Sequence, residues 1–165
     1  MTPFALLAIE IGMSFAILAV LSATVVVPRL AALPREYGLV PLLWVHALRH
    51  APLALLAPGQ SGAGVSHAVA STIAWGDFAS GAFALAALVA LSAAGARALG
   101  WVWAFSIVSS IDIVVALTLG LGSGVYREPL GPGWYVLTLY VPLVCVSQVL
   151  IVWLLVRRAP RVSRT

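Results

Sequence analysis

The chain has 165 residues, of which 62% are hydrophobic and 8% are charged, and its mean hydropathy is +1.09. A soluble domain usually has about 25% charged residues, and a water-soluble chain of this size could not bury so much apolar surface. The net charge of +4 does not indicate nucleic-acid binding, because much of it lies in the basic tail 157–165. The composition therefore excludes a soluble protein and predicts an all-α integral membrane helical bundle, with residues 1–165 forming a single domain.

Five apolar stretches follow one another along the chain. They cover about residues 4–27, 38–57, 67–93, 99–121 and 134–156, and each is close to the roughly 20 residues that cross a hydrocarbon core about 30 Å thick. We therefore predict about five transmembrane helices. The first stretch is expected to be a retained helix rather than a signal peptide, because no arginine precedes Arg29 and Glu10 interrupts the apolar run.

Prolines and glycines between the stretches predict short connections. Pro28 and Pro34 follow the first stretch, a glycine-rich segment at 58–64 follows the second, a tight turn is expected at 95–97, and the longest loop at 122–133. With the tail 157–165 in the cytoplasm, seven arginines face inward and only Arg127 faces outward, as the positive-inside rule requires. This predicts a multi-pass protein of the inner or plasma membrane with its N-terminus outside.

Ionisable residues inside the predicted spans are the candidates for a site. An arginine or aspartate at a helix centre costs roughly 2.5–3.5 kcal/mol on the insertion scale, so such residues persist where they pair or line a wet cavity. Six residues meet this description: Glu10, His46, Arg49, His50, Asp77 and Asp112.

Depth and helical spacing suggest that these residues meet. Arg49, Asp77 and Asp112 are expected near the midplane, within roughly one helical turn of one another. His46, Arg49 and His50 have the i, i+3, i+4 spacing of one helix face. Arg49 is permanently charged and needs a carboxylate, whereas the carboxylates outnumber it. A proton on a carboxyl, a charged histidine or a bound cation would balance the difference.

Small residues and a proline give further expectations. Asp77 shares its helix face with a stripe of small residues that suits close helix approach: Ala70, Ala74, Gly81 and Ala84. Pro52 follows His50 by two positions and removes a helical hydrogen bond. Two interpretations of Pro52 stay open: a broken helix that lines a cavity, or an ordinary proline kink.

The leading functional hypothesis is a charged intramembrane pocket that binds or translocates a small molecule, lipid or ion, with proton coupling as one form. One alternative is a metal or haem site with His46 and His50 as ligands, although the charge of Arg49 opposes it. A second is an intramembrane acid/base enzyme acting on an apolar substrate. A third is an accessory subunit of a membrane complex in which Arg49 and the aspartates form a purely structural network. The lipid bilayer is the expected partner, a homo-oligomer is compatible with the small bundle, and the sequence selects no cofactor.

Overall fold

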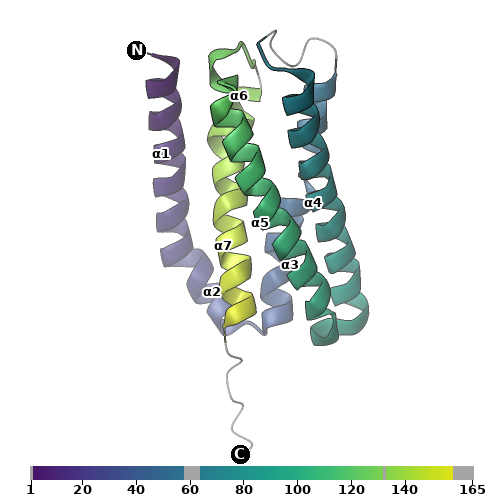
Figure 1. Cartoon of the computed structure of the whole chain (residues 1–165). Helices are drawn as coiled ribbons and strands as arrows, with labels where there is room; N and C mark the ends of the chain where they lie inside the picture. The colour runs from purple at the N-terminus through teal and green to yellow at the C-terminus, as the bar shows by residue number, and fades with distance from the viewer. Residues whose placement is uncertain (1, 58–63, 132, 158–165) are drawn as a thin grey trace, which may run out of the picture.

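The computed structural model of the chain describes residues 2–57, 64–131 and 133–157. Every regular element within these ranges is helical, and the long helices run roughly parallel to one axis (Figure 1). Four continuous helical stretches among the described residues are long and apolar enough to cross a membrane: Pro3–Ala32, Arg35–Leu56, His67–Gly122 and Gly133–Val156. The all-α class predicted from composition is therefore confirmed, and the length and composition of these four stretches are consistent with a membrane protein.

The first stretch is longer than expected. It consists of α1 (Pro3–Leu21), the π-helix η1 (Ser22–Val26) and α2 (Val27–Ala32). The prediction that Pro28 breaks the chain is wrong, because the helix continues through it to Ala32. In η1 the amide of Val27 donates to the carbonyl of Ser22, five residues back, and this wider turn changes the hydrogen-bond register just where proline lacks an N–H group.

The second stretch is broken. It consists of α3 (Arg35–Ala47), a turn at 48–50 and the 3₁₀ helix η2 (Ala51–Leu56). Pro52 lies in the first turn of η2, and the amide of Ala51 donates to the carbonyl of Leu48 at 3.2 Å. Of the two interpretations left open for Pro52, the structure therefore favours the broken helix over the ordinary kink.

The third stretch contains 56 residues and reverses direction. It consists of α4 (His67–Ala94), the 3₁₀ helix η3 (Gly95–Ala98) and α5 (Leu99–Gly122), and α4 packs against α5 (Figure 1). Gly95 has φ +52° and donates its amide to the carbonyl of Leu91. Glycine adopts this conformation without a steric penalty, so the tight turn predicted at 95–97 is confirmed.

The last stretch, like the first, contains a π-helix shortly before a proline. After the short 3₁₀ helix η4 (Val125–Arg127), it consists of α6 (Gly133–Tyr135), the π-helix η5 (Val136–Tyr140) and α7 (Val141–Val156). The π-helix ends two residues before Pro142, just as η1 ends two residues before Pro28. A π-turn therefore precedes both prolines that lie inside these two long apolar stretches.

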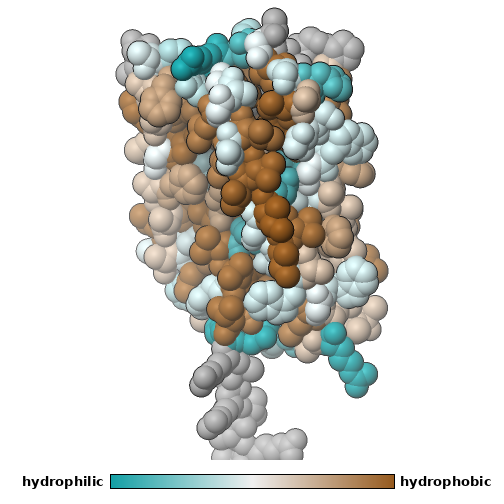
Figure 2. Space-filling view, viewed as in Figure 1, coloured by the Kyte–Doolittle hydropathy of each residue, from teal (hydrophilic) through white to brown (hydrophobic). Residues whose placement is uncertain are grey.

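The core lies between α3, α4, α5 and α7, while the outside is apolar. Leu39, Leu43, Phe105 and Ile151 are fully buried in one cluster. Many large apolar side chains are exposed instead, and in Figure 2 brown, hydrophobic atoms cover much of the side of the molecule whereas teal atoms gather near its two ends. Helix α1 packs against α7. Only Leu7 and Ser14 of α1 are buried.

Candidate functional site

Arg49 forms the centre of a buried polar cluster. It lies two residues beyond the end of α3 and is only 2% exposed. Its Nε donates to Asp77 Oδ1 on α4 at 2.6 Å, one terminal nitrogen donates to Ser109 Oγ on α5 at 2.7 Å, and the other forms an ion pair with Asp112 Oδ2 on α5. The end of α3 also favours a cation, because helix C-termini carry partial negative charge. Arg49 therefore pairs with both aspartates, whereas the sequence had left open which carboxylate is its partner.

The packing of α4 allows Asp112 to reach Arg49. Asp112 Oδ2 accepts a second hydrogen bond from Ser80 Oγ at 3.1 Å. A Cβ atom placed on Gly76 would lie 2.0 Å from Asp112 Oδ1, so the glycine leaves room for the carboxylate against the backbone of α4. The predicted small-residue stripe is buried as well, with Ala74 and Ala84 fully inaccessible.

His46 extends the cluster toward α7. Its ring is fully buried and packs edge-on against Phe105, with ring centroids 5.0 Å apart. Nε2 lies 3.0 Å from Ser147 Oγ, whose hydroxyl donates to the carbonyl of Val144, and Nδ1 lies 3.4 Å from Ser109 Oγ. A neutral imidazole with its proton on Nε2 satisfies this arrangement, since Ser147 then accepts and Ser109 can donate.

Two of the predicted site residues lie apart from this cluster. His50 is exposed, and its Nδ1 lies 3.5 Å from the carbonyl of Ala47. The prediction that His50 shares a helix face with His46 and Arg49 is wrong, because α3 ends at Ala47. Glu10 is half-buried on α1 and accepts a 2.6 Å hydrogen bond from Trp134 Nε1. It joins α1 to α6 rather than to Arg49.

The surroundings of the two histidines do not favour a shared metal. His46 is held between serines of α5 and α7, whereas His50 is exposed in the turn after α3. Among the residues that the structure describes, no group of three or more histidine, cysteine, aspartate or glutamate side chains could hold a metal ion.

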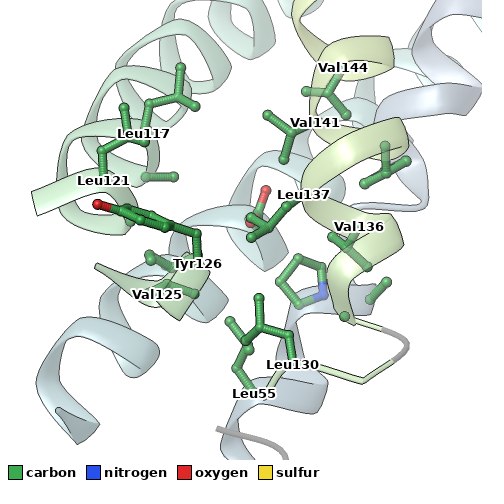
Figure 3. A pocket seen from close by; sticks show the side chains of 18 of the residues that line it. Leu55, Leu117, Leu121, Val125, Tyr126, Leu130, Val136, Leu137, Val141 and Val144 are labelled. Atoms are coloured by element: carbon green, nitrogen blue, oxygen red, sulfur yellow. The ribbon is translucent and has the colours of Figure 1, made fainter. Parts of the chain in front are cut away.

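A cavity of about 330 Å³ adjoins the charged cluster. Arg49 and Asp77 are the charged residues in its lining, and the rest of the wall is mainly apolar. The side chains come from α1, η2, α4, α5, η4, η5 and α7, and Figure 3 shows many of them around one open space. The broken second stretch contributes Ala51, Pro52, Ala54 and Leu55 to this wall. This volume is within the range of small-molecule sites, which are mostly apolar with a few polar groups.

Comparison with known proteins identifies a family. The family described as "Domain of unknown function (DUF8737)" matches residues 6–156. The chain belongs to this family. No curated protein and no solved structure matches the chain. The matched range of this DUF8737 member includes the Arg49 cluster and most of the described chain.

Several residues around the site were not singled out by the sequence. Tyr140 lines the cavity, and its hydroxyl donates to the carbonyl of Val45 at 2.9 Å. That carbonyl lies near the end of α3, where carbonyl groups lose their helical donors. The one available signal was Pro142, two positions after Tyr140, which marks a disturbed helix. No pattern predicted the apolar wall, because its residues come from elements scattered along the chain.

Proposed function

We propose that this DUF8737 member is a multi-pass membrane protein that binds a small amphipathic molecule in the cavity beside Arg49 and Asp77. The observation that supports this most strongly is the combination of an apolar wall with one charged end. The apolar part of the ligand would lie against the side chains of α5, η5 and α7. Its polar group would lie at Asp77. Translocation of such a molecule, with or without a proton, is the extension of this proposal.

The energetics of the bundle support a binding site. Arg49, Asp77 and Asp112 all lie in helical stretches of high mean hydropathy, and burying charge there is costly even when the charges pair. Asp77 also lines the cavity, so part of the network is directed toward a space that a molecule can enter. A network that served only to hold helices together would not need that space.

One observation favours a second candidate, the structural network. Arg49 uses three of its nitrogen atoms to join the end of α3 to α4 and α5. Such a junction would fix the packing of three elements and would also suit an accessory subunit of a membrane complex. The two candidates differ in whether the cavity is occupied.

Binding is tested by filling the cavity. The protein is purified in lipid nanodiscs, octanol is added as the probe, and binding is measured by native mass spectrometry and by the shift in unfolding temperature. Ala116→Phe places a ring in the cavity wall, whereas Val114→Phe changes a side chain that is 63% exposed on the same helix. We expect octanol to bind the unchanged protein and Val114→Phe but not Ala116→Phe. Absence of binding to the unchanged protein would favour the structural network.

We further propose that the chain crosses the membrane five times, with the N-terminus outside. A single straight helix over His67–Gly122 would be about 84 Å long, far more than a bilayer core, so its reversal at η3 supports two crossings. Helix α1 begins at one end of the bundle and α7 ends at the other (Figure 1).

Cysteine labelling at positions 62 and 162, which lie outside the described residues, tests this topology from its two sides. In a Cys145→Ser background, we expect Gly62→Cys but not Val162→Cys to react with an impermeant thiol reagent added to whole cells, and the reverse pattern would overturn this topology.

A further inference from the structure

We infer that the cavity selects a cationic polar group, so that the ligand is a lipophilic ammonium compound rather than an acid or an alcohol. This inference rests on the proposed function, because it names the chemical class for the same cavity. It follows from how the charges of the cluster are already used, from the free oxygen of Asp77 and from the composition of the cavity wall.

Arg49 has little capacity left for an anion. Its guanidinium contacts Asp77, Ser109 and Asp112 through all three nitrogen atoms, and the residue is 2% exposed. An anionic ligand would have to displace one of these aspartates and leave that carboxylate unpaired. An unpaired buried charge is strongly unfavourable. Among the residues that the structure describes, the rest of the cavity lining carries no positive charge.

Asp77, unlike Arg49, still has capacity to bind a ligand of opposite charge. One of its oxygens accepts from Arg49 Nε, and the second has no hydrogen-bond partner among the described residues. The only completely buried side-chain oxygen or nitrogen without a partner in those residues is Gln148 Oε1. The second oxygen of Asp77 is therefore accessible, although the residue as a whole is only 9% exposed, and Asp77 lines the cavity.

The charge balance agrees with this assignment. Arg49 contributes one positive charge, the ionised side chains of Asp77 and Asp112 contribute two negative charges, and the hydrogen bonds of His46 suit a neutral ring. With both carboxyls ionised, the cluster has a formal charge of −1, which is unfavourable in an apolar medium. An ammonium group at Asp77 would neutralise it. Tyr140 also lines the cavity and adds an aromatic ring of the kind that attracts cations.

The shape of the cavity limits the apolar part of the ligand. Its wall on α5 extends from Ile113 to Leu121, which corresponds to about 12 Å along the helix axis. An alkyl chain of medium length fits this distance. Octylammonium, octanol and octanoate are therefore suitable probes, since they share one chain and differ in the charge of the polar group.

The experiment compares the dissociation constants of these three probes at pH 7 in nanodiscs of uncharged lipid. Binding is measured with the unchanged protein, Asp77→Asn, and the cavity-filling variant Ala116→Phe as the background for partitioning into lipid. We expect octylammonium to bind at least about tenfold tighter than octanoate, equivalent to about 1.4 kcal/mol, and tighter than octanol. In Asp77→Asn the preference should disappear while octanol binding is retained.

The outcomes separate this inference from the proposed function. If none of the probes binds the unchanged protein more tightly than Ala116→Phe, the proposed binding function fails. If octanol binds specifically but octylammonium has no advantage over it, or octanoate binds as tightly as octylammonium, the cavity is a binding site and the inference about charge is wrong. The ranking in the unchanged protein decides the matter even if Asp77→Asn does not fold. A preference that persists in a folded Asp77→Asn protein would also overturn the role of Asp77.

Discussion

Replacement of Gly76 by alanine tests whether close packing of α4 against Asp112 holds the charged cluster together. The new Cβ atom would lie 2.0 Å from Asp112 Oδ1 and 3.1 Å from its Cγ. The carboxylate cannot simply rotate away, because Oδ2 is bound to both Arg49 and Ser80. We therefore expect the substitution to separate Asp112 from Arg49 or to push α5 away from α4.

The magnitude follows from two opposing effects. Breaking a buried ion pair costs about 3–5 kcal/mol, while alanine is favoured over glycine in a helix by up to about 1 kcal/mol. The free energy of unfolding should therefore fall by about 2–4 kcal/mol in Gly76→Ala. Reversible unfolding of the purified protein in mixed micelles, followed by tryptophan fluorescence, measures this change.

Gly81 provides a matched control on the same helix. A Cβ atom there would have its nearest neighbours at 3.5 Å, an ordinary contact distance, so Gly81→Ala should leave the free energy of unfolding unchanged or raise it slightly. A double mutant with Asp112→Ala supplies the second control, because removal of the carboxylate also removes the clash. Gly76→Ala should then cost little in the Asp112→Ala background. Equal effects of Gly76→Ala and Gly81→Ala, or additive effects in the double mutant, would refute the reasoning.

Three further substitutions test other contacts by the same unfolding measurement. Arg49→Ala should destabilise the protein by about 3–5 kcal/mol, and the double mutant Arg49→Ala/Asp77→Asn should be more stable than Arg49→Ala alone, whereas additive losses would mean that the pair does not interact. Tyr140→Phe removes the donor to the carbonyl of Val45 and should cost about 1 kcal/mol; no loss would show that this carbonyl needs no partner. Trp134→Phe should destabilise the protein less when Glu10→Gln is already present, because the bond between the two side chains is then already weakened; equal losses in both backgrounds would argue against that bond.

The sequence predicted the helical class and the approximate positions of the apolar stretches because those properties are local. Each stretch is long enough to cross a bilayer core, and a backbone in lipid satisfies its polar groups most simply as a helix. The wrong predictions concerned the effect of single prolines on the helices that contain them. Pro28 was expected to end a helix, but the π-turn of η1 accommodates it, and the break in the second stretch fell at Ala47, a position that Pro52 alone does not specify.

Some features of the site could likewise be predicted from the sequence, whereas others could not. Depth along the helices was sufficient to place Arg49, Asp77 and Asp112 at a similar level and to predict a carboxylate partner for the arginine, because the cost of burying a charge leaves few alternatives to pairing. It did not select which carboxylate that partner is. The placement of His50 could not be predicted, since it depends on where α3 ends, and helical spacing no longer applies beyond that residue.

By itself, the amino-acid sequence determined that this DUF8737 member has helical stretches apolar enough to cross a membrane and that an arginine within them requires a carboxylate partner. Both conclusions depend on the free energy of transferring single residues or segments into lipid. Only the tertiary structure decided that Asp77 keeps one accessible oxygen, that Gly76 makes room for Asp112, and that an apolar cavity ends at this cluster. These features depend on the relative positions of side chains from elements far apart in the chain, and packing between helices, rather than local composition, sets those positions.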